Sequence, residues 1–128
     1  MKLLLDTHTA LWCVNRHDKL STTARKILLD NTHVLHISII SAWEVAIKTS
    51  LGKLQGFNGG VKAFLAKMKA MPIVLVPITP LHVEMVETLP FIHRDPFDRL
   101  LVATAKVDDM TILTADENIH KYDVSSIW

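Results

Sequence analysis

Short apolar segments alternate along this chain with longer amphipathic ones, and this alternation limits the fold more than any other feature. The apolar runs are residues 2–5, 34–40, 73–76 and 111–114, and their length and aliphatic or β-branched content are typical of buried strands. Between them lie amphipathic stretches over about 8–15, 41–51, 61–70, 80–88 and 98–107, and a further helix that Ser21 would cap. With residues 125–127 as a fifth strand, the pattern predicts an α/β fold: a three-layer α/β/α sandwich with a mostly parallel central sheet of 4–5 strands.

The size and charge of the chain suit one compact domain over residues 1–128. Hydrophobic residues make up 49% and charged residues 21% of the sequence, as in ordinary globular proteins. The net charge of +1 neither indicates nor excludes a nucleic-acid partner, because a local basic patch can lie beside an acidic pocket.

Cysteine content and hydropathy indicate a cytoplasmic protein. The single cysteine, Cys13, cannot form an internal disulfide and fits a reducing compartment. The opening apolar run is too short for a secretory signal, and no stretch approaches the length of about 20 apolar residues that spans a membrane.

Four acidic residues stand at the predicted strand ends or helix starts: Asp6, Glu44, Asp98 and Asp116. The carboxyl ends of parallel strands share one edge of a sheet, where ligands bind in open α/β folds. Carboxylates gathered there repel one another unless a cation lies between them, and oxygen ligands suit Mg²⁺ or Mn²⁺. The pattern therefore favours a metal-dependent site for phosphoryl-transfer chemistry.

Two of these acids also have ordinary structural explanations. Asp6 could cap the helix that follows it, unless Thr7 takes that role and leaves Asp6 free. Glu44 stands three residues after Ser41, the spacing of a capping box, and Lys48 lies four residues farther along the same helix.

The other two acids have similar alternatives. Asp95-Pro96-Phe97-Asp98 is a typical helix start, with Asp95 the better cap and Asp98 the better metal ligand. Asp116 could likewise begin a short helix. What weakens these separate explanations is that all four acids are predicted at one edge of one sheet.

The chain resembles the PIN-domain family of metal-dependent ribonucleases, and within it the VapC-type toxins. The resemblance rests on four segments in family order, of which the third is the most specific: LLDTH (4–8), SAWE (41–44), HRDPFDRLL (93–101) and LTAD (113–116). It implies a Mg²⁺- or Mn²⁺-dependent endonuclease that acts on RNA, with Asp6, Glu44, Asp98 and Asp116 as its catalytic and metal-binding residues.

The resemblance also implies roles for neighbouring residues. Asp6 and Asp98 are expected as direct ligands of the main ion, with Glu44 and Asp116 completing the shell through water or binding a second ion. Asp95 matches a position that is often acidic in the family. Thr7 and Thr114 would orient a ligand or a water. Because the pocket itself is acidic, cations around it are expected to hold RNA phosphates, and the candidates are Lys48, Lys53, Arg94 and Arg99, unless Arg99 forms a salt bridge with Asp95 or Asp98 instead.

Three partners follow from the resemblance: an RNA substrate, single-stranded or in a structured loop, a cognate antitoxin, and a second copy of the chain in a homodimer. No membrane partner is expected. Apolar surface for protein contacts would come from Met68, Met71 and Met85 on the helices at about 61–70 and 80–88.

Other functions remain open at this stage. The chain would also suit a nuclease acting on DNA, or a catalytically silent module that keeps the fold and uses its acids as caps. A dehalogenase-type phosphatase is disfavoured because His8 stands where a second aspartate is needed. The histidines do not pair with zinc-site spacing, and His33 and His36 are expected on opposite faces of a strand.

Overall fold

The computed structural model describes all 128 residues as one five-stranded parallel sheet with helices on both faces. The strand order is β3-β2-β1-β4-β5, and every neighbouring pair is parallel. In chain order the elements are β1 (Lys2–Leu5), α1 (Thr7–Asn15), a 3₁₀ turn η1 (His17–Lys19), α2 (Thr22–Leu29), β2 (Val34–Ser38), α3 (Ile39–Ser50), α4 (Gly60–Ala70), β3 (Ile73–Val76), α5 (Pro80–Thr88), α6 (Pro96–Asp108), β4 (Thr111–Leu113), α7 (Glu117–His120) and β5 (Ser126–Ile127). The predicted α/β/α sandwich with five strands is confirmed.

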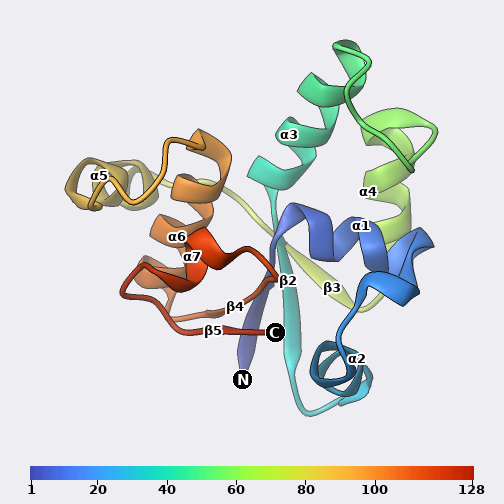
Figure 1. The fold of residues 1–128 in the computed structure, drawn as a ribbon, viewed down its shortest axis with the longest axis horizontal. Helices are drawn as coiled ribbons and strands as arrows, with labels where there is room; N and C mark the ends of the chain where they lie inside the picture. The colour runs from blue at the N-terminus through green and yellow to red at the C-terminus, as the bar shows by residue number, and fades with distance from the viewer.

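Two apolar cores lie on opposite faces of the sheet, because successive strand residues point to opposite sides. Leu4 and Ile112 belong to the core beneath α5, α6 and α7, whereas Leu5 and Leu113 belong to the core beneath α1, α2, α3 and α4. Figure 1 shows these two groups of helices on either side of the strands. Both faces of the central strand β1 are therefore covered, and Leu4 and Leu5 have no exposed surface.

The boundary between β2 and α3 differs from the prediction. The strand ends at Ser38, and the Ser38 hydroxyl accepts a hydrogen bond from the backbone N–H of Ile40 at 3.0 Å. The helix thus begins at Ile39, and the prediction of Ser41 as its cap is wrong. Glu44 consequently lies inside the helix and not in a capping box. The β-branched pair Ile39-Ile40 suggested strand, but the serine cap before it determines the local structure.

The segment between α3 and α4 is a turn, as predicted, and it is tied to α1. The Asn15 side-chain amide donates a hydrogen bond to the Gly56 carbonyl. Gly59, the N-cap residue before α4, has a φ of 97°, and a Cβ there would lie 2.7 Å from the Cβ of Ala63, so only glycine fits without movement. The chain has no helix with both the length and the apolar character to cross a membrane.

Candidate active site

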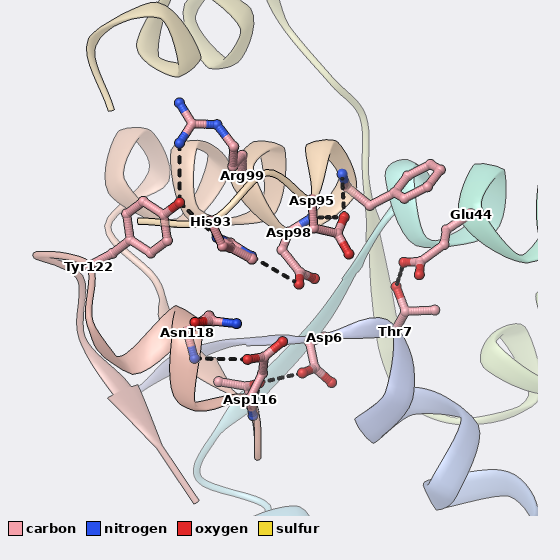
Figure 2. A network of polar contacts seen from close by, with 12 residues as sticks. Asp6, Thr7, Glu44, His93, Asp95, Asp98, Arg99, Asp116, Asn118 and Tyr122 are labelled. Atoms are coloured by element: carbon pink, nitrogen blue, oxygen red, sulfur yellow. Dashed lines mark hydrogen bonds and ion pairs between the residues drawn. The ribbon is translucent and has the colours of Figure 1, made fainter. Parts of the chain in front are cut away.

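The four acids predicted from the sequence come from four segments that meet at the carboxyl ends of the strands. Asp6 follows β1, Asp116 follows β4, Glu44 lies in α3 after β2, and Asp98 lies in the first turn of α6. Figure 2 shows Asp98 pointing toward Asp6 and Asp116, with Glu44 beside Thr7 on the far side of Asp6. We call these four acids the carboxylate edge.

Asp6 is buried, and both of its carboxylate oxygens accept hydrogen bonds. Its Oδ1 accepts a hydrogen bond from the backbone N–H of Thr9 at 2.7 Å, so Asp6 is the cap of α1 and the alternative of Thr7 as the cap is wrong. Its Oδ2 accepts a hydrogen bond from the Thr114 hydroxyl. Burial nevertheless raises the pKa of Asp6, because these hydrogen bonds and the nearby His8 only partly offset the loss of hydration.

Thr114 connects two members of the carboxylate edge. Its hydroxyl donates to Asp6 and accepts a hydrogen bond from the backbone N–H of Asp116 at 3.0 Å. Asp116 in turn caps α7, because its Oδ1 accepts from the backbone N–H of Asn118 at 2.8 Å. One oxygen of Asp116 thus has a structural role, as the sequence allowed, while the residue still lies at the site.

Glu44 is buried between a hydroxyl and an ammonium group. The Thr7 hydroxyl lies 2.7 Å from Oε1 of Glu44 and 2.9 Å from the Ser41 hydroxyl. Since a carboxylate only accepts, Thr7 donates to Glu44 and Ser41 donates to Thr7. The Lys48 ammonium lies 2.5 Å from Oε2, as the i,i+4 spacing predicted. These contacts fix the direction in which Glu44 points.

Asp98 experiences the repulsion expected for gathered carboxylates. Burial raises its pKa to about 8, with further contributions from the charges of Asp95, Asp116, Asp6 and Glu44. The ionised form of Asp98 is therefore disfavoured unless a cation offsets the surrounding charge.

The neighbouring acid Asp95 has the capping role that the sequence assigned to it. Its Oδ1 accepts from the backbone N–H groups of Phe97 at 2.9 Å and Asp98 at 3.2 Å. The Phe97 ring meets the ring of Trp43 edge to face, with centroids 5.4 Å apart, so α3 and α6 are in contact beside the site. Asp95 thereby sets the position from which Asp98 projects.

A chain of hydrogen bonds behind Asp98 was not predicted. The Arg99 guanidinium lies 3.1 Å from the Tyr122 hydroxyl, which lies 2.9 Å from Nδ1 of His93, while Nε2 of His93 lies 3.3 Å from Oδ2 of Asp98 (Figure 2). Arginine only donates, so the Tyr122 oxygen accepts from Arg99 and the Tyr122 hydrogen can be donated to Nδ1; this arrangement would put the hydrogen of His93 on Nε2, facing Asp98. No local pattern pairs Tyr122 with the segment containing His93; only the fold brings them together.

Arg99 is a structural residue, and its prediction as an RNA contact is wrong. The side chain is buried, with 6% exposure, and donates to the carbonyl of Pro90 at 2.8 Å and to those of Val86 and Leu89 at 3.4 Å. The exposed Phe91 ring lies over the guanidinium, 4.5 Å from centroid to carbon. Arg99 therefore holds the loop before α6, whereas Lys53 and Arg94 are exposed and Lys48 is partly exposed.

The donor set of the carboxylate edge fits Mg²⁺ or Mn²⁺ better than zinc or an iron centre. The side chains that meet there offer carboxylate and hydroxyl oxygens, and their mutual repulsion would be relieved by a divalent cation. The His, Cys, Asp and Glu side chains do not form a ready-made cluster of three or more ligating groups. The residues that could hold such an ion are the four acids of the carboxylate edge, Asp6, Glu44, Asp98 and Asp116.

Comparison with known families identifies one match. A model of the PIN domain matches residues 3–125, which is nearly the whole chain. No curated protein matches the chain by sequence.

Solved structures with the same fold include several toxin–antitoxin complexes. A VapBC2 complex from Rickettsia felis, bound to a promoter DNA fragment, has a TM-score of 0.74 and 14% identity, and the match covers 100% of this chain and 99% of that chain. VapBC-1 from nontypeable Haemophilus influenzae has a TM-score of 0.66 and 14% identity, covering 99% and 97%. A toxin–antitoxin complex from Klebsiella pneumoniae has a TM-score of 0.60 and 15% identity, covering 98% and 96%.

Proposed function

The chain belongs to the PIN-domain family, and from this premise we propose that residues 1–128 form one PIN domain that acts as a Mg²⁺- or Mn²⁺-dependent endoribonuclease, the VapC-type toxin of a toxin–antitoxin pair. The observation that carries the proposal is the carboxylate edge itself. Asp98 is surrounded by the charges of Asp6, Glu44, Asp95 and Asp116, and such an arrangement is costly for folding alone. Perturbed carboxylates gathered at a sheet edge are typical of functional sites.

Phosphodiester hydrolysis requires attack by water on phosphorus, cleavage of the bond to the leaving oxygen, and a group that accepts the proton of the water. A divalent ion held by Asp6 and Asp98 would neutralise phosphate charge and increase the acidity of water at the site. Thr114 and Thr9 hold Asp6 in place, and His93 donates to Asp98. These contacts orient the carboxylates of Asp6 and Asp98 before substrate arrives.

Glu44 and Asp116 lie on either side of this pair and would complete the surroundings of the ion through water or bind a second ion. Glu44 is held by Thr7 and Lys48, and Asp116 is held by the start of α7. Separate elements therefore hold Glu44 and Asp116 on either side of Asp6 (Figure 2).

The RNA strand must be held by cations around this acidic centre. Arg94, next to the site on the loop before α6, and Lys53, after α3, are exposed and available to phosphates. We place the reaction in the cytoplasm, where RNA is present. The alternatives are a nuclease that acts on DNA and a silent PIN-fold module.

Two protein partners are also proposed. The similar solved structures are toxin–antitoxin complexes, which supports a cognate antitoxin. A homodimer is supported by exposed apolar residues on α5, where Leu81 is 62% and Val83 is 58% exposed. Met68, expected to contribute such a surface, is buried in the core beneath α4.

The first test is cleavage of a mixed RNA pool by the purified, antitoxin-free protein with Mn²⁺, beside the Asp98→Asn variant. Cleavage that requires the metal and is absent in the variant supports the proposal. A parallel reaction with single-stranded DNA distinguishes the two nuclease alternatives. Intact nucleic acid in every reaction, from protein shown to be folded, would favour the silent module.

A further inference from the structure

A groove of about 440 Å³ lies between α1, α3 and the segment that follows α3. Its lining residues are His8, Leu11, Trp12, Asn15, Arg16, Lys48, Lys53, Leu54, Gln55, Gly56 and Phe57. These elements lie together on one face of the sheet (Figure 1), and the hydrogen bond from Asn15 to Gly56 closes the groove between α1 and the turn.

The charge of the groove is one-sided. Arg16, Lys48 and Lys53 line it together with His8, and no aspartate or glutamate is among the lining residues. The chain as a whole has 14 basic and 13 acidic residues, so this local excess is not a consequence of composition. A surface with this distribution attracts a polyanion.

The cations that line the groove differ in whether they form ion pairs with acidic side chains. Lys53 forms no ion pair and is exposed. Arg16 pairs with Asp18 at 3.0 Å, but their side chains are 49% and 65% exposed, and such surface pairs are weak. Lys53 is therefore the residue whose charge is most available to a ligand.

One wall of the groove is aromatic. The Trp12 ring is half-buried, and its centroid lies 5.9 Å from that of His8 and 5.7 Å from that of Trp128. The Phe57 ring is held edge to face against Phe64, with centroids 6.2 Å apart. Rings fixed beside cations are the combination by which proteins bind single-stranded nucleic acid, with bases on the rings and phosphates on the cations.

The groove adjoins the carboxylate edge at Glu44, through one ion pair and one chain neighbour. Lys48 lines the groove and contacts Glu44 at 2.5 Å, while His8 lines the groove and follows Thr7, which donates to Glu44. The groove therefore begins beside Glu44, a member of the carboxylate edge.

We propose that this groove binds the single-stranded RNA next to the cleaved phosphate, with phosphates on Lys53 and Arg16 and a base on Trp12. The inference rests on the proposed nuclease function and adds the substrate class and its position. Double-stranded RNA does not fit, because its paired bases are stacked on each other and cannot lie on an aromatic ring in a pocket of this size. An acidic peptide would satisfy the cations but would leave the aromatic wall unused.

The experiment measures RNA binding separately from cleavage. The Asp98→Asn protein is titrated with a fluorescent 12-nucleotide oligouridylate. Two double variants, Asp98→Asn with Lys53→Ala and Asp98→Asn with Lys26→Ala, are titrated in the same way. Lys26 is an exposed lysine on α2 outside the groove and is the matched control. We expect Lys53→Ala to weaken binding several-fold and to reduce the slope of log affinity against log salt by about 0.7, as for one lost phosphate contact on a single strand. Lys26→Ala is expected to leave both unchanged.

A second comparison tests base stacking. Trp12→Leu removes the ring, and Trp12→Phe keeps an aromatic face. We expect Trp12→Leu to weaken binding of the oligouridylate by about fivefold or more, as for loss of one stacked base, and to leave an abasic strand of the same length unaffected. Trp12→Phe is expected to retain the preference for bases. If Trp12→Leu does not fold, the comparison of Lys53→Ala with Lys26→Ala still decides the matter.

Three results would overturn the inference: equal binding by Lys53→Ala and Lys26→Ala, equal affinity for a duplex of the same length, or displacement of the RNA by deca-glutamate as effectively as by unlabelled RNA of equal charge. The last would assign the groove to acidic peptides.

Cleavage of RNA by the wild-type protein is scored separately. If cleavage is present and these effects are absent, the groove assignment is wrong and the nuclease stands; if the effects are present without cleavage, the nuclease assignment is wrong.

Discussion

Asp6 and Thr114 are 108 positions apart in the chain, yet the Thr114 hydroxyl donates directly to the Asp6 carboxylate. The contact exists because β1 and β4 are neighbours in the sheet, with Leu5 paired to Leu113. The same hydroxyl also accepts a hydrogen bond from the backbone N–H of Asp116. It therefore links Asp6, at the end of β1, to Asp116, which follows β4.

Removing that hydroxyl is expected to destabilise the protein. In Thr114→Ala the buried Asp6 loses a donor, and an unsatisfied buried group costs about 1–3 kcal/mol. Thr114→Ser keeps the hydroxyl and is expected to recover most of that loss. Urea denaturation of the metal-free proteins measures the difference, and equal stability of the alanine and serine variants would argue against the contact.

The strands, and the position of the four acids at one edge of the sheet, could be predicted because those signals are local. The buried run ending at Asp6 and the proline-led start of the helix containing Asp98 can each be read within a few residues. The contacts of Arg99 and Tyr122 could not be predicted in this way. Arg99 is surrounded by carbonyls of the α5 region and by a tyrosine 23 positions later, so its burial depends on packing between elements.

Asp98→Asn is expected to change stability little in the metal-free protein. The substitution removes a carboxylate whose ionised form is disfavoured by burial and by four neighbouring acids, and it keeps the size of the side chain. We therefore expect a free energy of unfolding within about 1 kcal/mol of wild type, or slightly higher. Asn15→Ala, which removes the tie from α1 to Gly56, is a comparison outside the site. A large loss of stability in Asp98→Asn alone would indicate a structural role for the carboxylate.

Mn²⁺ is expected to raise the melting temperature of the wild-type protein. A ligand that binds only the native state stabilises it, by about 2.7 kcal/mol when its concentration is one hundred times the dissociation constant. The Asp98→Asn and Asp6→Asn variants are expected to show a much smaller rise. Differential scanning calorimetry with and without millimolar Mn²⁺ measures the effect; an equal rise in wild type and both variants would place the ion elsewhere.

The stability of the metal-free protein is expected to fall as pH rises from about 4 to about 8. The pKa of Asp98 is raised from 3.8 to about 8 in the folded protein, so across this range the folded state holds a proton that the unfolded state has lost. The contribution is complete at low pH and is lost as pH rises through the folded pKa. Asp6, whose pKa is also raised, acts in the same direction.

Asp98→Asn separates these two contributions. The variant is expected to show a flatter dependence of unfolding free energy on pH, with the remaining slope due to Asp6 and to other groups. Parallel urea denaturation at several pH values without divalent metal provides the comparison. Curves with the same slope for both proteins would contradict the assignment of the shift to Asp98.

Tyr122→Phe is expected to release His93 while leaving Arg99 in place. Arg99 keeps its hydrogen bonds to the carbonyls of Pro90 and Leu89, but Nδ1 of His93 loses the donor that holds the hydrogen on Nε2, facing Asp98. The Tyr122 hydroxyl makes two hydrogen bonds, with Arg99 and with His93, and loss of each costs about 0.5–1.5 kcal/mol of stability. The decisive measurement is nitrogen NMR of the His93 ring. The wild-type ring is expected to carry its hydrogen on Nε2, and in the variant ring the hydrogen is expected to exchange between both nitrogens.

Since His93 would orient a proposed metal ligand, Mn²⁺ affinity is expected to fall about 10-fold or more in the variant. An unchanged ring signal and unchanged affinity would show that the tyrosine only fills space.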